Sequence, residues 1–456
     1  MRESVLADVP RDVVAAQVVD PEAIEGEILS VSEKKLCLSC RFPSHPPPVT
    51  FAQRRAASAD QQRDRAGSGM RGIQEQFPQE RVIFGIPVAE ALAQQMDALG
   101  AERVFIMCSG TLSRKTPVIE DLGKALGARF VGLFDEMPAH SPRSALLRAA
   151  ERAREARPDL LLSVGGGSSI DGAKMMQLML AEDVRSHDDF DAFHLRRGAG
   201  GALENPGFRS GTIRQIAVPT TLSGAEYTTT AGSVDDVRHK KDLYVGPSLV
   251  PISVILDPAV ARHTEDGLWY STAVRAIDHA VESIYSPKAN PFTDATCIHG
   301  LRMMQEALRG TRKDPDDLAA RLDALMAVWL STTGMGRGQH GASHGISYSL
   351  AAIAHVPHGH CSCVLLPATL RFNKPWTEER QALIAELLGR PGADAADALL
   401  ELLRELGQPT TLREVGVTHD QLPQIARTVV ASGQASGNPR PVEREEDIME
   451  ILETAW

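Results

Sequence analysis

The residues best suited to proton transfer and to binding a carboxylate lie in the C-terminal half of the chain. Arg275 and His279 are four positions apart in a helix-period segment, so their side chains share one face of the expected helix. Asp278 follows Arg275 by three positions and Glu282 follows His279 by three, so either carboxylate can orient its partner. This face therefore combines a fixed positive charge, a titratable imidazole and two carboxylates.

A second group of titratable side chains follows in the stretch GASHGISYSLAAIAHVPHGH. His344 and Tyr348 share a helix face at i and i+4, and His358 follows Pro357 at an expected turn. A single histidine is most often a hydrogen-bonded residue of the core or the surface. Several histidines on helix faces and at turns of one region instead predict a shared site. The candidate catalytic residues are Arg275, His279, His344, Tyr348 and His358.

A glycine-rich turn in the N-terminal half is the strongest candidate for binding a cofactor phosphate. The stretch DLLLSVGGGSSIDGAK runs from an apolar, strand-like segment through Gly165, Gly166 and Gly167 into a helix-period segment. Glycines let backbone N–H groups approach a ligand closely, and Ser168 or Ser169 can cap a helix whose positive end faces the same point. The spacing is neither that of the common dinucleotide fingerprint nor that of the P-loop, and taken alone it equally describes an ordinary strand-to-helix turn.

Two further strand ends carry small hydroxyl side chains. VPTTLSGAEYT places Thr220, Thr221 and Ser223 after a strand, where they can hydrogen-bond a nucleotide, although a plain Ser/Thr-rich turn has the same composition. Ser109 follows the strand of VFIMC, at the position where a carboxylate would bind a ribose 2′-hydroxyl and repel a 2′-phosphate. A serine there admits either NADH or NADPH. The candidate cofactor-binding residues are Ser109, Gly165, Gly166, Gly167, Ser168, Ser169, Asp171, Lys174, Thr220, Thr221 and Ser223.

Alternating strand-like and helix-like segments must position these residues. The expected strands span 103–107, 129–134, 160–164, 215–219 and 254–257. The expected helices between them span 118–126, 144–156 and a segment from Ser169. This alternation predicts βαβ units, a parallel sheet and ligands at the carboxyl ends of its strands. Later helix-period segments at 272–285, 293–308, 318–333 and 394–406 predict an all-α region, with the active site in the cleft between the halves.

The chain divides into three predicted regions. Residues 1–70 show little periodicity, a proline cluster at 43–48 and a polar run at 53–68, so we expect them to be poorly ordered. Their acidic residues argue against a transit peptide, and Met70 is a candidate for the natural start. Residues 71–257 form the expected Rossmann-like dinucleotide-binding domain, and residues 258–456 the helical substrate and catalytic domain.

Composition narrows the class of protein. The 456-residue chain is 43% hydrophobic and 23% charged, which is typical of a soluble protein of two or three domains. A net charge of −11 argues against a nucleic-acid partner, and no apolar run reaches the roughly 18 residues that span a bilayer. With no secretory signal, we expect a cytoplasmic protein. Cys37 and Cys40 form a lone C-x-x-C pair, a weak zinc signal. The cysteines expected to be reduced and packed are Cys108, Cys297, Cys361 and Cys363.

Four motifs occur together and in order: GGGSSIDGAK, PTTLSGAE, DHAVE and HGISYSLAAIAHVPHG. With them, the chain from about Gly72 to its C-terminus resembles the iron-containing alcohol dehydrogenase superfamily. GASHGI, VPHGHCSCVLLPATLRFN and GNPRPV are similar to the maleylacetate reductases, a branch that reduces maleylacetate to 3-oxoadipate in aromatic-ring degradation. The resemblance implies a dehydroquinate synthase-like architecture and an NAD(P)-dependent oxidoreductase acting on a small dicarboxylate. We also expect a homodimer.

The sequence departs from the metal-dependent members of this family at the metal site. Those members hold iron or zinc with an Asp and a His at i and i+4 and with two later histidines. Matching the motifs places Arg275 at the aspartate position and His279, His344 and His358 at the other three. A guanidinium cannot ligate a cation and repels it, and Tyr348 replaces the second histidine of an H-x-x-x-H pair. Three histidines can still form a zinc site, so that alternative stays open.

An arginine in place of a metal ligand suits a different electron acceptor. A simple aldehyde needs a Lewis acid to stabilise an alkoxide, whereas a conjugated 4-oxo-2-enedioate accepts hydride at carbon and spreads the charge over an enolate. We therefore expect a metal-independent NAD(P)H-dependent reductase in which Arg275 binds a carboxylate and His279, His344 or His358 donates a proton.

Other readings of the same residues remain. Arg275 can instead form a helix-surface ion pair with Asp278. The protein can be a metal-dependent alcohol dehydrogenase of the same fold or a catalytically inactive nucleotide-binding protein. A lyase of the dehydroquinate synthase type is disfavoured, because it should keep the carboxylate ligand that Arg275 replaces.

Overall fold

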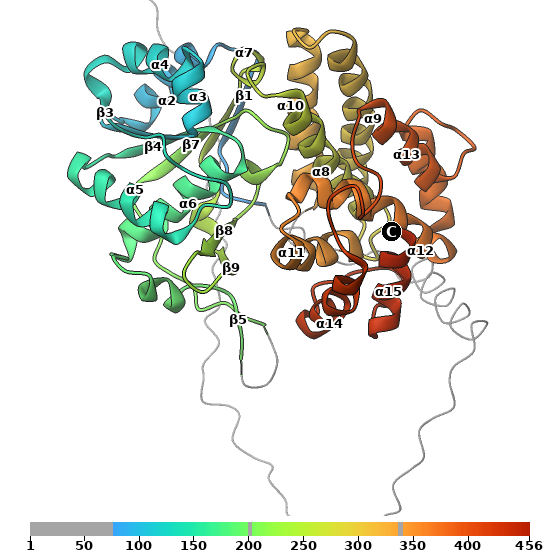
Figure 1. The fold of residues 1–456 in the computed structure, drawn as a ribbon. Helices are drawn as coiled ribbons and strands as arrows, with labels where there is room; N and C mark the ends of the chain where they lie inside the picture. The colour runs from blue at the N-terminus through green and yellow to red at the C-terminus, as the bar shows by residue number, and fades with distance from the viewer. Residues whose placement is uncertain (1–75, 199–202, 336–340) are drawn as a thin grey trace, which may run out of the picture. The chain divides into compact units, whose positions relative to one another are not determined.

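The computed structural model describes residues 76–198, 203–335 and 341–456. The expectations for residues 1–70, including the start at Met70 and the Cys37/Cys40 pair, lie outside the described residues. In the described part, every strand precedes Asp257, and the elements that follow are helices, as Figure 1 shows. The predicted fold class, a parallel α/β region followed by an all-α region, is therefore confirmed.

The α/β region is built on one six-stranded parallel sheet in the order β1-β10-β7-β4-β2-β3. Its strands are β1 (Arg81–Phe84), β2 (Val104–Cys108), β3 (Phe130–Phe134), β4 (Leu160–Gly165), β7 (Arg214–Pro219) and β10 (Ser253–Leu256). The chain moves from β2 outward to β3 and then returns to place β4 on the other side of β2. This reversal is a topological switch point, where open α/β sheets bind ligands.

Helices cover both faces of the sheet (Figure 1). Successive strand side chains point to opposite faces, so Val104 and Ile106 of β2 join one core while Phe105 and Met107 join the other. The first core includes α2 and α4, and the second includes α5 and α6. The bounds are α2 (Val88–Leu99), α3 (Gly110–Lys115), α4 (Val118–Leu126), α5 (Arg143–Ala156) and α6 (Gly167–Ala181).

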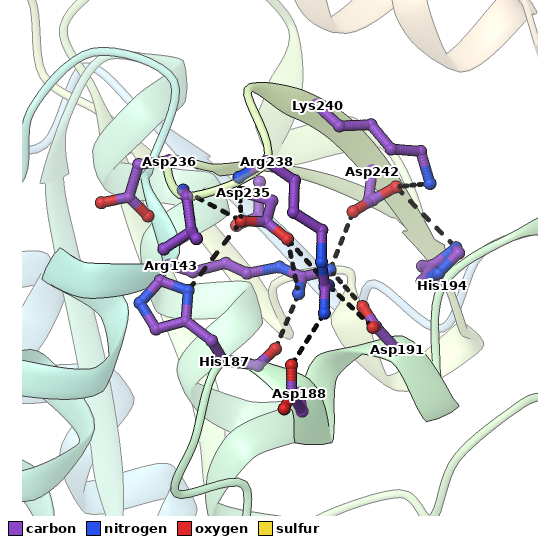
Figure 2. Close-up of polar contacts among 12 residues, drawn as sticks. Arg143, His187, Asp188, Asp191, His194, Asp235, Asp236, Arg238, Lys240 and Asp242 are labelled. Carbon is purple, nitrogen blue, oxygen red and sulfur yellow. Dashed lines mark hydrogen bonds and ion pairs between the residues drawn. The ribbon is translucent and has the colours of Figure 1, made fainter.

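Two antiparallel hairpins extend the α/β region, and neither was predicted. They pair β5 (Arg196–Arg197) with β6 (Leu203–Glu204) and β8 (Thr230–Asp235) with β9 (Lys240–Val245). Figure 2 shows the ion pairs that fix the second hairpin: Arg143 of α5, whose side chain is fully buried, lies 3.1 Å from Asp235 and 2.8 Å from Asp242. Asp191 adds a third carboxylate at 2.9 Å. Both strands of this hairpin are thereby tied to α5.

The helical region packs around α8. Its helices are α7 (Pro258–Ala261), α8 (Asp266–Ile284), α9 (Pro291–Lys313), α10 (Leu318–Met335), α11 (Ala342–Ala354), α12 (His358–Leu387), α13 (Ala395–Glu405), α14 (Leu422–Ser432) and α15 (Glu445–Thr454). α8 contacts α9, α10 and α12, and its core-facing side chains include Ala273, Val274 and Ile277. Because α8 is enclosed by its neighbours, Asp278 and His279 are buried as well. Polar groups in such a position require partners.

The four cysteines that were predicted to be packed, Cys108, Cys297, Cys361 and Cys363, are buried free thiols. Burial raises the pKa of Cys108 to about 12 and that of Cys297 to about 11. A thiol must lose its proton to act as a nucleophile or metal ligand. These two side chains therefore serve packing and not chemistry.

Candidate active site

One cavity of about 1470 Å³ brings the two groups of candidate residues together, in agreement with the predicted cleft. Its wall includes residues of the glycine-rich turn and of the sheet loops as well as residues of the helical region. The sequence-predicted residues that line it are Ser109, Gly166, Gly167, Ser168, Ser169, Asp171, Thr220, Thr221, Ser223, Arg275, His279, His344, Tyr348 and His358. Gly165 and Lys174 do not line it.

The glycine-rich turn forms one end of the cavity at the switch point of the sheet. α6 begins at Gly167 with Gly166 as its N-cap residue, and no side chain caps it. The first N–H groups of a helix lack intrahelical partners, and the helix dipole favours an anion there. A Cβ atom at Gly166 would lie 2.9 Å from Thr221 Cγ2, so only glycine lets these two loops approach so closely. The arrangement fits a phosphate of a dinucleotide.

The prediction that Ser168 or Ser169 caps this helix is wrong. Gly165 has a φ of +145°, a conformation that turns the chain so sharply that the helix starts before either serine. The Ser168 hydroxyl instead accepts a hydrogen bond from the backbone N–H of His140 at 3.1 Å. Two residues that were predicted to bind the cofactor do not line the cavity. Gly165 makes the turn, and the Lys174 side chain is fully buried.

Lys174 fixes the loop that follows β7 and its Ser/Thr-rich segment. Its Nζ donates to the carbonyl oxygens of Ala225, Thr228 and Thr230 at 2.6, 2.8 and 2.8 Å. Burial lowers the pKa of Lys174 to about 8. Three backbone carbonyl acceptors account for this lysine without a cofactor, so in this structure it supports the cavity wall from behind.

Ser109 lies where the sequence placed it, directly after β2. It is the N-cap residue of α3, and its hydroxyl accepts from the backbone N–H of Leu112 at 3.3 Å. The three strands β7, β4 and β2 are neighbours, so the loops that follow them meet at one edge of the sheet. Ser109, the glycine-rich turn and Thr220–Ser223 thus line one continuous wall of the cavity.

The face of α8 carries the charged residues of the site. Arg275 Nη1 donates to the Ser362 hydroxyl at 3.2 Å and lies 3.7 Å from Asp278 Oδ2. The Arg275 side chain, 11% exposed, lines the cavity, and the Asp278 side chain is fully buried, so the pair is not a helix-surface ion pair. Asp278 Oδ2 also accepts from the hydroxyls of Ser343 and Ser362 at 2.8 and 2.7 Å.

A chain of hydrogen bonds links Glu282, His344 and His279. His344 Nδ1 lies 2.8 Å from a Glu282 carboxylate oxygen, and His344 Nε2 lies 2.8 Å from His279 Nδ1. Glu282 therefore orients His344 of α11, not His279, its neighbour on α8. The same carboxylate accepts from the backbone N–H groups of Gly341 and Ser343 at 2.8 and 2.9 Å.

The acceptors at both ends of this chain favour one arrangement of its protons. His279 Nε2 lies 3.4 Å from the carbonyl oxygen of Ser223, which can only accept, so we assign the hydrogen to Nε2 and the lone pair to Nδ1 of a neutral ring. With this assignment His344 donates from Nε2 to His279 and from Nδ1 to Glu282, as an imidazolium. Burial and Arg275 lower the pKa of His344, but Asp278 and Glu282 outweigh them and the net shift is upward.

His358 and Tyr348 also line the cavity. His358 is the first residue of α12, with Pro357 as its N-cap residue, so the predicted turn is the start of a helix. Its ring centre lies 6.2 Å from that of Tyr348 and 5.8 Å from that of His140. His358 Nε2 lies 2.6 Å from Lys241 Nζ. Burial and the Lys241 ammonium lower the pKa of His358 well below its usual range.

Sequence reasoning missed Lys241 and His140, which both line the cavity. Lys241 is in β9, a strand with no apolar alternation, and His140 is in a loop before α5 with a positive φ of 66°. A non-glycine residue with positive φ often marks a functional or strained position, but only the structure reveals it.

Comparison with known proteins assigns the family. A model described as "Iron-containing alcohol dehydrogenase" matches residues 78–258, and one described as "Fe-containing alcohol dehydrogenase family, C-terminal" matches residues 270–456. The chain belongs to the iron-containing alcohol dehydrogenase family. It is therefore an oxidoreductase of an NAD(P)-dependent family.

Individual relatives in this family support the maleylacetate reductase branch. Maleylacetate reductase 2 of Cupriavidus pinatubonensis is 32% identical over 82% of this chain and 94% of its own length. The dehydrogenase FUM7 of Gibberella moniliformis is 31% identical over 81% of this chain and 95% of its own length. The crystal structure of maleylacetate reductase from Agrobacterium tumefaciens has a TM-score of 0.70 at 26% identity and covers 85% of this chain and 99% of that chain.

The family name implies a metal, so we consider which side chains of the site could act as its ligands. His279 and His344 are hydrogen-bonded to each other through the nitrogens that face each other, and His358 is engaged by Lys241. In the part of the chain that the structure describes, the one group of three potential ligands within 4.8 Å of one another is Asp278, Glu282 and His344. To bind there, a metal would have to displace the His344 proton from Glu282.

No described helix combines the length and the apolar character needed to cross a membrane.

Proposed function

We propose that this family member is a metal-independent, NAD(P)H-dependent reductase of a conjugated oxo-enedioate such as maleylacetate. The observation that carries the proposal is Arg275. It lies on the cavity wall in α8, and the resemblance of the motifs matches it to the position where metal-dependent members of the family carry a ligand carboxylate. The names of several relatives, maleylacetate reductases of bacteria, support the same substrate class.

The residues of the site suit each part of this reduction. A reduced nicotinamide, when bound, supplies the hydride. The alkene carbon distal to the ketone accepts it, and the electron pair of the C=C bond moves to the ketone oxygen as an enolate. A proton then adds to the other alkene carbon, so the product is the saturated oxo-dicarboxylate. Arg275 offers a planar fork for a carboxylate, and its two described contacts both use Nη1, which leaves further N–H donors for the ligand.

The chain Glu282–His344–His279 is suited to delivering the proton. His279 lines the cavity and is 5% exposed, while His344 behind it is fully buried. His279 Nε2–H donates to the enolate carbon, and the ring regains a proton at Nδ1 from the His344 imidazolium. His279 Nε2 then regains a proton from solvent and His279 returns its Nδ1 proton to His344, whose restored positive charge Glu282 stabilises. These proton transfers need no metal. A metal ion bound here would place a second positive charge close to the Arg275 guanidinium.

The proposal is tested with purified protein. NADH and NADPH oxidation should be measured with maleylacetate and with simple aldehydes, before and after chelation, together with the bound metal content. We expect turnover of maleylacetate that chelation leaves unchanged and little turnover of aldehydes. Stoichiometric iron or zinc, with activity lost on chelation and restored by the metal, would instead favour the Asp278, Glu282 and His344 group as a metal site. NADH binding without turnover of either class would indicate the inactive nucleotide-binding protein.

A further inference from the structure

We propose that Lys241 is the second anion anchor of the cavity and holds the substrate carboxylate that Arg275 does not bind. This inference rests on the proposed function, because it assigns the two carboxylates of a dicarboxylate to two cations. Neither the family assignment nor the relatives' names single out this lysine.

Lys241 is a cavity cation with no ion-pair partner among the described residues. Its Nζ lies 2.6 Å from His358 Nε2, and among the residues with described positions no carboxylate oxygen lies within 4.0 Å of it. The preceding residue differs: the Lys240 side chain is 59% exposed, and its Nζ lies 2.7 Å from Asp242. Figure 2 shows this ion pair. A cation beside a cavity with a neutral imidazole as its hydrogen-bond acceptor has charge left for a ligand.

The hairpin that carries Lys241 is fixed in place. The buried Arg143 binds Asp235 of β8 and Asp242 of β9, so the residue next to Lys241 is anchored to α5 (Figure 2). Side chains alternate along a strand, so Lys241 points away from the face of Asp242. Its diagonal neighbour is Gly232: a Cβ atom there would lie 3.0 Å from Lys241 Cε and 3.7 Å from Asp171 Oδ2. The missing side chain leaves room for the lysine stem beside Asp171.

The charges around Lys241 favour an anion in the cavity. Burial lowers the pKa of Lys241, the Asp171 carboxylate opposes that shift, and the like charge of Arg275 adds to it. Asp171 is partly committed, since it accepts from the backbone N–H of Gly232 at 3.1 Å. Two cations that face one cavity repel each other, and an anion bound between them removes the repulsion.

Two anchors of different kinds also orient a ligand. Lys241 comes from β9 of the α/β region and Arg275 from α8 of the helical region. An ammonium binds a carboxylate as a point charge, whereas a guanidinium binds it through two parallel hydrogen bonds. A dicarboxylate held at both ends must lie between the two anchors, which restricts where its alkene carbons sit relative to the glycine-rich turn.

The test compares maleylacetate with two truncated enones. 4-Oxopent-2-enoate keeps the carboxylate on the alkene, and 3-oxohex-4-enoate keeps the carboxylate next to the ketone. Lys241→Met should lower kcat/KM for maleylacetate by about 100-fold. It should lower kcat/KM by a similar factor for one truncated enone and leave the other within about threefold. Arg275→Lys should show the opposite preference between the two truncated enones.

Control variants separate this effect from general damage. Lys124→Met removes an exposed lysine of α4 that pairs with Glu120 at 2.6 Å, and it should leave all three substrates unchanged. Lys241→Gln is a second test in case Lys241→Met folds poorly, because glutamine keeps a polar side chain beside His358. It should show the same pattern of losses that we expect of Lys241→Met. If Lys241 variants lose all three substrates equally, or lose none, the lysine does not anchor a carboxylate and the inference is wrong.

A binding experiment distinguishes failure of this inference from failure of the proposed function. Calorimetry on the NADPH complex should show that wild type prefers adipate to hexanoate, and that Lys241→Met removes this preference. If wild type fails to reduce maleylacetate but keeps the Lys241-dependent preference, the proposed reaction is wrong and the anion anchor stands. If wild type reduces maleylacetate while Lys241→Met binds adipate normally, the anchor is wrong and the reaction stands.

Discussion

Replacing Arg275 with lysine tests whether its fork, and not only its charge, binds the substrate. The lysine keeps a cation near Asp278. Asp278 Oδ2 still accepts hydrogen bonds from the hydroxyls of Ser343 and Ser362 at 2.8 and 2.7 Å, so the buried carboxylate keeps its partners. The variant therefore loses mainly the bidentate geometry. We expect kcat/KM for maleylacetate to fall on the order of 100-fold, which corresponds to roughly 2.7 kcal/mol of transition-state stabilisation.

The assay for Arg275→Lys is steady-state oxidation of NADPH, with NADPH affinity measured separately by fluorescence. The affinity should change by less than about threefold, because Arg275 lies on the helical side of the cavity and not at the glycine-rich turn. Arg309→Lys provides a matched control, since Arg309 of α9 pairs with Glu405 at 3.3 Å and is 38% exposed. Equal kcat/KM values for wild type and Arg275→Lys would show that the fork does not touch the substrate.

Three further predictions follow from other parts of the structure. Ser109→Asp should weaken NADPH use by roughly 1 to 3 kcal/mol through repulsion of the 2′-phosphate, whereas unchanged relative use of NADH and NADPH would show that Ser109 does not face the ribose. Burial lowers the pKa of His344, but the carboxylates beside it produce a net rise, so kcat should stay constant at low pH and fall as pH rises through that raised pKa. Glu282→Gln should move this alkaline limb to lower pH in a pH–rate profile, and an unmoved limb would remove Glu282 from the proton path. Starting the chain at Met70, before the described residues begin, should leave melting temperature and turnover unchanged, and a large fall in either would contradict the prediction.

Most of the strands that could be predicted from the sequence are the central strands of the parallel sheet, whose side chains are buried on both faces. β2 and β4 are apolar on both faces because helices cover both sides, and such runs stand out against the helices between them. β9 begins Lys-Lys-Asp and has no such pattern, because its position depends on an ion pair with Arg143 from another part of the chain. α12 was also missed as a helix, since Pro367 and Pro375 lie inside it and proline disfavours a helix interior.

In the site, too, local spacing could be predicted from the sequence and contacts between distant parts of the chain could not. Helical spacing was sufficient to place Arg275 and His279 on one face, because i and i+4 are geometric neighbours. It could not show that Glu282 contacts His344, which lies 62 residues away, or that Lys241 contacts His358, which lies 117 residues away. The helix start at Gly167 was missed for a different reason: it depends on the backbone conformation of Gly165, which composition does not reveal.

The motif match places Arg275 where metal-dependent members of the family carry a metal ligand, and on the proposed function the arginine keeps a positive charge there while changing the chemistry. A metal and a guanidinium are both cations, and each can face a negatively charged substrate from the same position on α8. The guanidinium is tolerated in this buried place because Asp278, three residues along the same face, lies 3.7 Å away as its counter-ion. What is lost is direct coordination of a carbonyl oxygen, which matters for an alkoxide and much less for an enolate whose charge is already delocalised. Because Asp278 and Glu282 point to Arg275 and His344, a restored carboxylate at position 275 would add a third negative charge to this cluster. On the proposed function, the arginine in α8 therefore suits a conjugated dicarboxylate acceptor through both its charge and its fork.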